Sequence, residues 1–136
     1  KKDKKFIQKI LKQINNGKNE LHIVNDKLGT PTYTHDFAAN VKLLIEKNVR
    51  GLFNMVCEGL TDRLEVATEL VRIMGIQNDI KIKEVNSDYF AKEYFAKRPD
   101  CERLVNKRLG EMNLNIMRNW KNSLRTYLID YYSDYI

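Results

Sequence analysis

The sequence predicts an α/β fold in which helices and short strands alternate along the chain. Segments with apolar residues every three or four positions, as in an amphipathic helix, alternate with apolar runs of strand length. One run, residues 52–57, is almost continuously apolar, which is typical of a strand buried on both faces of a parallel sheet. A chain of 136 residues fits one domain. We therefore expect a single domain over residues 1–136, with a few short strands and about five helices.

The first four expected elements are a helix over residues 6–14, a strand over 21–24, a helix over 37–47 and a strand over 52–57. Gly17 follows the first helix, at a position where glycine favours a helix end. A loop rich in glycine, proline and threonine precedes the second helix, which Thr34 or Asp36 could cap. Gly51 and Gly59 bound the apolar run, so its predicted length is that of a short strand.

The remaining expected elements are a helix from Thr61 or Asp62 to Met74, a strand over 80–83, a short helix from Ser87 or Asp88, a turn or helix over 106–110, and a last helix from about Asn119. Asp62 and Glu65 have the spacing of a capping box, and Gly75 closes that helix. Isoleucine and lysine alternate in the strand, which indicates one exposed face. Pro99 ends the short helical segment.

The net charge of +6 is concentrated in lysines near the start of the chain. A basic first helix could attract nucleic acid or an anionic ligand, but a solvated lysine face is the simpler interpretation. No interleaving of aromatic and basic residues accompanies it, so we do not expect nucleic-acid binding. No apolar run reaches the length of a membrane helix, and the basic start lacks the apolar core of a signal peptide. We expect a cytoplasmic protein.

The two cysteines give no sign of a metal site, because Cys57 and Cys101 are far apart and neither has a CxxC partner. Cys57 ends an apolar run and is expected to be buried. A reduced chain is the main expectation, although a disulfide between the two stays open. His22 lies in a predicted strand without a metal partner, and His35 and Asp36 are expected in the first turn of a helix.

Residues 26–38 carry the most informative motif, Asp-Lys-Leu-Gly-Thr-Pro-Thr-Tyr-Thr-His-Asp-Phe-Ala. This segment resembles the Asp-x-x-Gly-Ser/Thr-Pro-Thr loop in the C-terminal half of extended short-chain dehydrogenases, most closely the dTDP-4-dehydrorhamnose reductases. Four further segments resemble the same family in the same order: residues 51–55, 61–67, 97–104 and 106–109, the last followed by Trp120.

The resemblance implies that this chain is the C-terminal part of a Rossmann-type reductase or epimerase, where the nucleotide sugar binds. The N-terminal Rossmann half, which binds NADP or NAD in such enzymes, would be absent. The resemblance assigns substrate binding to the residues of the loop and to an arginine near the pyrophosphate: Thr30, Pro31, Thr32, Tyr33 and Arg98. Glu102 departs from the family, which often has serine at this position.

The residues themselves give no cofactor site and no catalytic pair. The six glycines never approach a dinucleotide-binding spacing, and no tyrosine has a lysine four positions later. Tyr94 and Arg98 have that spacing, but arginine stays protonated. We therefore predict no bound cofactor, no catalytic residue and no dehydrogenase activity for this chain alone.

Simpler interpretations and one alternative function stay open. The Gly-Thr-Pro-Thr loop could merely set the entry to the next helix, and Arg98 could pair with Asp100 or Glu102. An isolated strand of the buried type needs neighbours, which a missing upstream sheet or a partner chain would supply. The alternative is therefore a non-catalytic protein-interaction module, and a homo-oligomer is also possible.

Overall fold

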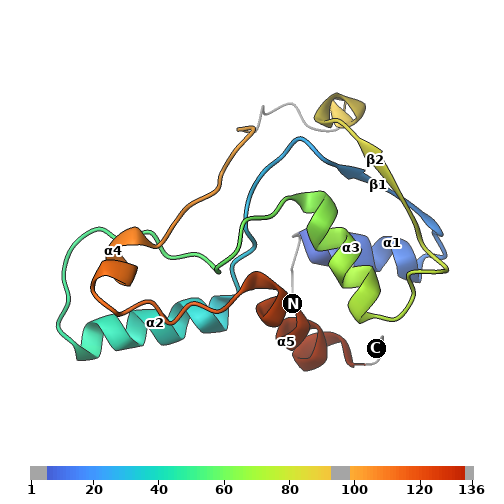
Figure 1. The fold of residues 1–136 in the computed structure, drawn as a ribbon. Helices are drawn as coiled ribbons and strands as arrows, with labels where there is room; N and C mark the ends of the chain where they lie inside the picture. Colours follow the sequence, from blue (N-terminus) through green and yellow to red (C-terminus); the bar gives the residue numbers. More distant parts are fainter. Residues whose placement is uncertain (1–5, 93–98, 134–136) are drawn as a thin grey trace.

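The computed structural model of the chain describes residues 6–92 and 99–133, and within them the α/β class with about five helices is confirmed (Figure 1). The elements in chain order are α1 (Phe6–Asn15), β1 (Glu20–Val24), α2 (Thr34–Glu46), α3 (Arg63–Ile73), β2 (Lys81–Val85), a 3-10 helix η1 (Ser87–Phe90), α4 (Lys107–Glu111) and α5 (Trp120–Tyr132). No helix in these described ranges is long and apolar enough to cross a bilayer.

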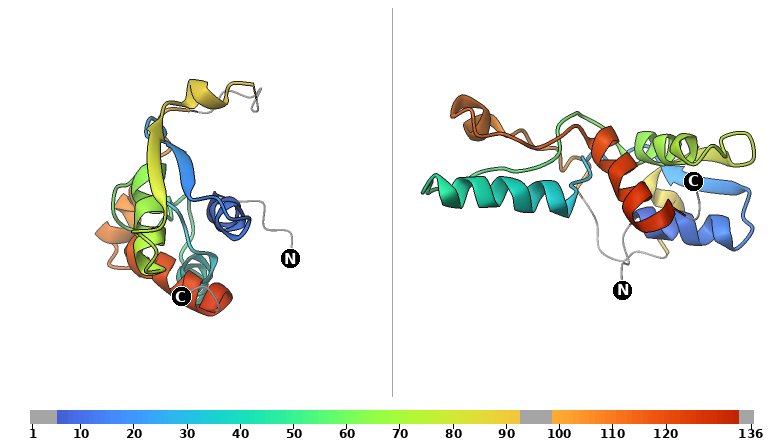
Figure 2. Two further views of the ribbon diagram at one scale, coloured as in Figure 1. Left: turned by 90° about the vertical axis from the view of Figure 1, so that its right-hand side faces the viewer. Right: turned by 90° about the horizontal axis from the view of Figure 1, so that it is seen from below.

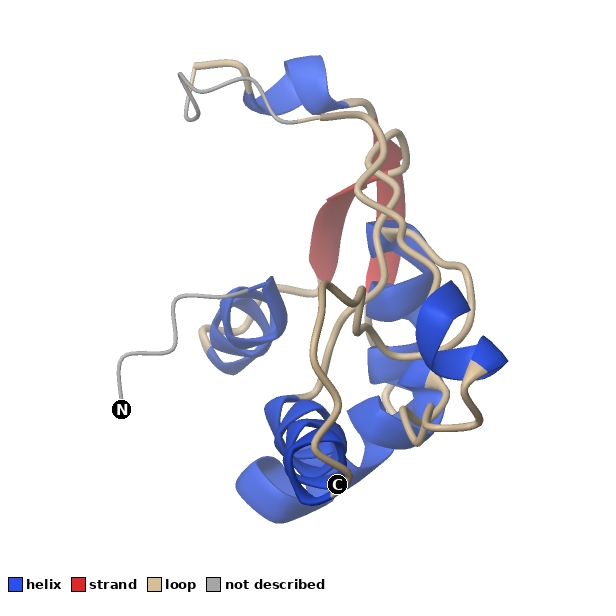
Figure 3. Cartoon of the chain, turned by 90° about the vertical axis from the view of Figure 1, so that its left-hand side faces the viewer, coloured by secondary structure: helices blue, strands red, loops and turns tan. Residues whose placement is uncertain are grey.

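The two strands form a parallel pair (Figure 3). In this pair Leu21 lies opposite Ile82, and Val24 lies opposite Val85. β1 is largely buried, whereas β2 is mostly exposed, as its alternation of isoleucine and lysine predicts. Parallel strands need a long crossover connection, and here it contains both α2 and α3.

The main core lies between β1 and the helices α1, α3 and α5. We call these four elements, together with β2, the body. Apolar residues from each of these elements are buried in it: Ile10, Leu11, Leu21, Ile23, Leu70, Val71, Trp120, Leu124 and Leu128. Burying one such leucine or isoleucine side chain stabilises the fold by about 1.5 to 3 kcal/mol. These residues follow the helical or strand period of the sequence, which is why the body could be predicted from it.

The helices α2 and α4 and the segments 47–58 and 103–119 form an arm that projects from the body (Figures 1 and 2). Its interior is small and partly polar. The Asn40 side chain is fully buried and donates to the Leu114 carbonyl at 2.9 Å, while its oxygen accepts from the Ile116 amide at 3.0 Å. The buried side chains of Leu44 and Leu109 provide apolar contacts.

The predicted strand over residues 52–57 is wrong for this chain, since no strand forms there in the described structure. A strand needs a neighbouring backbone, and none of the described segments pairs with residues 52–57. Instead, the Asn106 side chain bonds the amide and the carbonyl of Val56 at 2.9 and 2.8 Å. Directly after this segment, Glu58 forms an isolated parallel β-bridge with Asn119.

The start of α2 also differs from the prediction, because the helix begins at Thr34 rather than at residue 37. Neither Thr34 nor Asp36 caps it. Tyr33 occupies the N-cap position without a side-chain hydrogen bond, and Asp36 lies in the first turn. In contrast, the predicted cap of α3 is confirmed, since the Asp62 carboxylate accepts from the Glu65 amide at 2.8 Å.

Candidate functional site

A cleft of about 640 Å³ opens between the start of α1, the loop 27–34, the start of α3 and α5. Its volume lies within the usual range for sites that hold small molecules, roughly 300 to 1,000 Å³. The four loop residues singled out by the sequence motif all line it: Thr30, Pro31, Thr32 and Tyr33. Apolar walls are provided by Phe6 and Ile7 of α1, and by Trp120, Leu124 and Tyr127 of α5.

Hydrogen bonds from two other segments hold the loop in place. The Leu28 amide donates to the Asp100 carbonyl, and the Glu102 amide donates to the Leu28 carbonyl, each at 2.8 Å. On the other side, the Thr30 hydroxyl donates to the Gly59 carbonyl at 3.0 Å. The loop is therefore fixed before any ligand arrives, which reduces the entropy that binding must overcome.

Tyr33 closes one end of the cleft with a side chain that is already fully engaged. Its hydroxyl donates to the Asp130 carboxylate at 3.0 Å, and burial together with this acceptor raises the pKa of Tyr33 to about 12. Its ring stacks on His35 with a centroid separation of 4.9 Å and meets Tyr127 edge-on. These contacts hold the Tyr33 side chain in place at the cleft.

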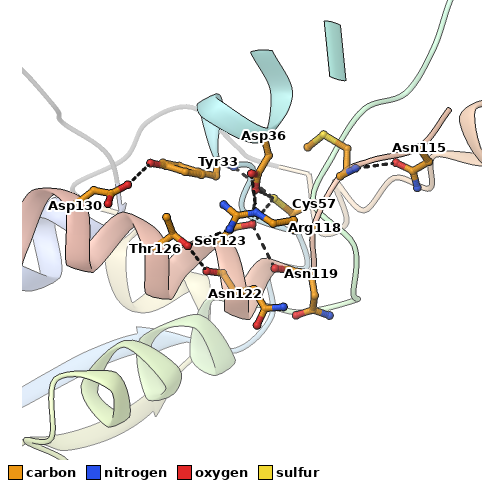
Figure 4. Close-up of polar contacts among 11 residues, drawn as sticks. Tyr33, Asp36, Cys57, Asn115, Arg118, Asn119, Asn122, Ser123, Thr126 and Asp130 are labelled. Atoms are coloured by element: carbon orange, nitrogen blue, oxygen red, sulfur yellow. Dashed lines mark hydrogen bonds and ion pairs between the residues drawn. The ribbon is translucent and has the colours of Figure 1, made fainter. Parts of the chain in front are cut away.

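A buried polar cluster lies behind the loop (Figure 4). Asp36 accepts from the Ser123 hydroxyl at 2.5 Å and from the Arg118 Nε at 2.8 Å. The Cys57 Sγ lies 3.5 Å from the Ser123 hydroxyl and accepts from the Tyr33 amide at 3.4 Å. The cluster therefore joins the start of α2 to α5, and both elements line the cleft. Cys57 is buried, as predicted, and Cys101 is exposed; both are free thiols.

Charges of both signs surround the cleft. Lys27 and Arg63 line it, together with the carboxylates of Asp62 and Glu102. Lys27 pairs with Asp100 at 2.6 Å. The Asp62 carboxylate is held by its capping bond, so it is directed at the α3 backbone.

Just before Lys27, two hydrogen bonds lower the pKa of Asp26. They come first from the Ser87 amide and then from the Ser87 hydroxyl, each accepted by the Asp26 carboxylate. These bonds favour the charged carboxylate and tie the loop before the cleft to η1.

The remaining residues singled out from the sequence lie in different places. Arg98 lies outside the described residues, although Pro99 and Glu102 beside it line the cleft. His22 of β1 stacks on the ring of Tyr89 in η1. No group of three metal-binding side chains occurs within residues 6–92 and 99–133.

Sequence reasoning missed the cluster of Asp36, Ser123 and Arg118. Asp36 was visible within the motif, but its partners are more than 80 positions away, and nothing in the local pattern indicates them. The α1 side of the cleft was also missed, because the helical spacing of Phe6 and Ile7 indicates only that they face a core.

The fold and cleft define a class of protein: a small α/β domain that offers a ready-made ligand cleft between one loop and three helices. Comparison with known families gives the particular family. The chain belongs to the RmlD substrate binding domain family, whose model matches residues 1–133.

Known relatives agree with this assignment. The spore coat polysaccharide biosynthesis protein SpsK of Bacillus subtilis is 29% identical over 90% of this chain, and a dTDP-4-dehydrorhamnose reductase of Mycobacterium tuberculosis is 25% identical over 88%. The matches cover 41% and 38% of those proteins. The chain therefore spans about two fifths of the length of these relatives.

Solved structures show the same relationship. A dTDP-4-dehydrorhamnose reductase of Clostridium acetobutylicum matches 94% of this chain, and 44% of its own length, with a TM-score of 0.82 and 32% identity. The reductase of Bacillus anthracis, solved in complex with NADP, matches 96% of this chain with a TM-score of 0.83. Its identity is only 20%, so that likeness shows the fold alone.

Proposed function

We propose that this chain is the substrate-binding part of an NAD(P)-dependent nucleotide-sugar reductase similar to dTDP-4-dehydrorhamnose reductase. The observation that supports this most directly is that the motif loop, from Thr30 to Tyr33, lines the cleft between α1, α3 and α5. Membership of the substrate-binding family agrees with a ligand in this position.

In this proposal the loop contacts the sugar. The Thr32 side chain is exposed and makes no hydrogen bond within the described part of the chain, so its hydroxyl is available to a ligand. Thr30 uses its hydroxyl proton on the Gly59 carbonyl, which leaves its oxygen as an acceptor. The pyrophosphate would lie near Arg98, because the neighbouring Pro99 borders the cleft.

The hydride chemistry belongs to residues outside these 136. NADP or NAD would bind to a Rossmann half that this sequence does not contain, and that half would supply the tyrosine and lysine that move the proton. The role left to this chain is to bind and orient the nucleotide sugar against the cofactor.

Calorimetric titration of the chain with dTDP and dTDP-glucose tests the proposal. Arg98→Ala should weaken the binding of dTDP by about 10-fold or more, because a charged hydrogen bond contributes roughly 1.5 to 3 kcal/mol. Arg50→Ala, an exposed arginine in the arm, is the matched control and should leave the affinity unchanged. If wild-type protein binds neither compound, the proposal fails.

The same titration distinguishes the proposed substrate-binding function from the alternative, which is a non-catalytic protein-interaction module. The apolar side chains that the arm exposes favour this second function. A chain that binds no nucleotide but associates with itself or with a protein partner would support it.

A further inference from the structure

Two of the charged side chains that line the cleft are not engaged by the protein. Lys27 pairs with Asp100, and the Asp62 carboxylate caps α3. Arg63 and Glu102 line the same cleft and are exposed. Within the part of the chain that the structure describes, neither side chain makes a hydrogen bond or an ion pair. One cation and one carboxylate are therefore available to a ligand.

The backbone of the loop keeps these two side chains on opposite sides of itself. Leu28 forms one β-bridge with Asp62 and another with Cys101. Neighbouring β segments lie about 4.8 Å apart, so the two outer segments are roughly 10 Å from each other. Arg63 directly follows Asp62 in one outer segment. Glu102 directly follows Cys101 in the other. A ligand lying on the loop thus meets a positive charge on one side and a negative charge on the other.

Glu102 lies beside the part of the loop that contacts the sugar in the proposed function. Its backbone amide donates to the Leu28 carbonyl at 2.8 Å. A Cβ atom placed on Gly29 would lie 3.9 Å from the Cβ of Glu102, so the Glu102 side chain begins directly next to Gly29. The following residue, Thr30, lines the cleft. The free carboxylate is therefore placed near the sugar.

Arg63 lies on the other wall of the cleft, where α3 begins opposite α1. Its guanidinium is 5.9 Å from the centre of the Phe6 ring. An arginine with free donors suits a phosphate group, which it can bind with two parallel hydrogen bonds. The positive side of the cleft therefore matches the anionic part of a nucleotide sugar.

The free carboxylate of Glu102 needs a different partner. Next to an anionic ligand it lowers the affinity by repulsion, unless the ligand places a positive group beside it. An amino group on the sugar meets this need, because such a group is largely protonated at neutral pH, like an α-amino group. A neutral hydroxyl group can donate to the carboxylate but does not compensate its charge.

We propose that Glu102 is a specificity-determining residue whose carboxylate binds an amino group on the sugar of the ligand, while Arg63 binds a phosphate group of the same molecule. The inference rests on the proposed function and names the class of sugar within it. The family often has serine at the position of Glu102, so this preference distinguishes the present chain from such relatives.

Calorimetric titration with matched pairs of nucleotide sugars tests the assignment. One pair is UDP-glucosamine and UDP-glucose, which differ on the second carbon of the sugar. The other is a dTDP sugar with an amino group on its fourth carbon and the same sugar with a hydroxyl group there. In at least one pair the wild-type chain should bind the amino form about 5-fold more tightly. This is less than the effect of a buried charged hydrogen bond, because Glu102 is exposed. Glu102→Gln should abolish the preference without weakening the binding of dTDP.

Two further variants separate the roles of the two charges. Glu111→Gln makes the same change of charge on exposed α4 in the arm and should leave all affinities unchanged. Arg63→Gln should weaken the binding of dTDP and of every sugar by a similar factor, about 5-fold, and should leave the amino preference intact. All three side chains are exposed, so the variants should fold, and circular dichroism checks this.

Three results would overturn the proposal: no amino preference in either pair, a preference that persists in Glu102→Gln, or a loss of preference in Glu111→Gln as well. An unchanged affinity of Arg63→Gln for dTDP would overturn the role of Arg63. A wild-type chain that binds dTDP without any amino preference refutes only the assignment of Glu102. A chain that binds no nucleotide refutes the proposed function itself, and the assignment falls with it.

Discussion

Replacing Gly59 with alanine should destabilise the protein strongly, because this residue is constrained in two ways. Its φ of +95° lies in a region that residues with a side chain rarely adopt. A Cβ atom at this position would also lie 2.9 Å from Asn119 Nδ2 and 2.9 Å from Trp120 Cδ1. Trp120 is only 3% exposed and packs in the core, so it has little room to move.

The expected loss can be divided between these two causes. A side chain at positive φ costs about 1 to 2 kcal/mol. Crowding in a packed interior typically adds about 1 to 3 kcal/mol. Gly59→Ala should therefore lower the free energy of unfolding by about 2 to 5 kcal/mol.

Gly75→Ala is the matched control, since Gly75 also has a positive φ, +70°, but nothing lies within 4 Å of its added Cβ. That variant should lose only about 1 to 2 kcal/mol from backbone strain. Urea unfolding followed by circular dichroism measures both losses. If Gly59→Ala costs no more than Gly75→Ala, the packing of Trp120 against Gly59 is not as described. Because the Gly59 carbonyl also accepts from Thr30, Gly59→Ala should weaken the binding of dTDP as well.

Three further predictions concern the polar contacts around the cleft. Ser123→Ala removes the hydrogen bond to the buried Asp36 and should cost about 1 to 3 kcal/mol in urea unfolding. If the loss were no larger than that expected for replacing an exposed serine with alanine, the buried cluster would be contradicted. The raised pKa of Tyr33 means that the folded protein favours the neutral phenol. Its contribution to stability should thus be complete below pH 10 and lost as the pH rises toward about 12. Tyr33→Phe should remove the latest phenol transition from an ultraviolet titration. The pKa of Asp26 is lowered, so the folded state favours its carboxylate. That contribution should be complete above the ordinary pKa of 3.8 and lost on further acidification. Ser87→Ala keeps the backbone amide and removes only the hydroxyl, so it should reverse part of the lowering of the Asp26 pKa in a carbon-detected titration. An unchanged pKa would refute the contribution of the hydroxyl.

Elements governed by local signals could be predicted from the sequence. The capping bond of Asp62 and the buried stripe that follows it predicted α3 to within one or two residues at each end. The apolar pattern of the last helix likewise placed Trp120 at its start. In both cases the deciding interactions connect residues only three or four positions apart, so the chain itself displays them.

The site could be predicted only in part, because its walls come from distant segments. The motif located the loop from Thr30 to Tyr33, and the structure places all four residues in the cleft. Asp36 was interpreted as a possible helix cap. In the structure it is buried and bonded to Arg118 and Ser123 instead. Long-range bonds of this kind have no period or spacing in the sequence.

The segment 52–57 shows why a sequence pattern can be correct about an environment that the chain alone does not provide. Its apolar run predicts burial on both faces, yet Leu52 is 83% exposed, and Phe53 to Met55 make no backbone hydrogen bond to any residue that the structure describes. Water can satisfy those groups in the separate chain, but it does not compensate for the exposed apolar surface of Leu52 and Ile45. The body differs, because its own helices cover β1. The arm should therefore be less stable than the body. In a native-state hydrogen-exchange measurement the amides of the arm should exchange faster than those of the body, and equal protection of both would contradict this reasoning.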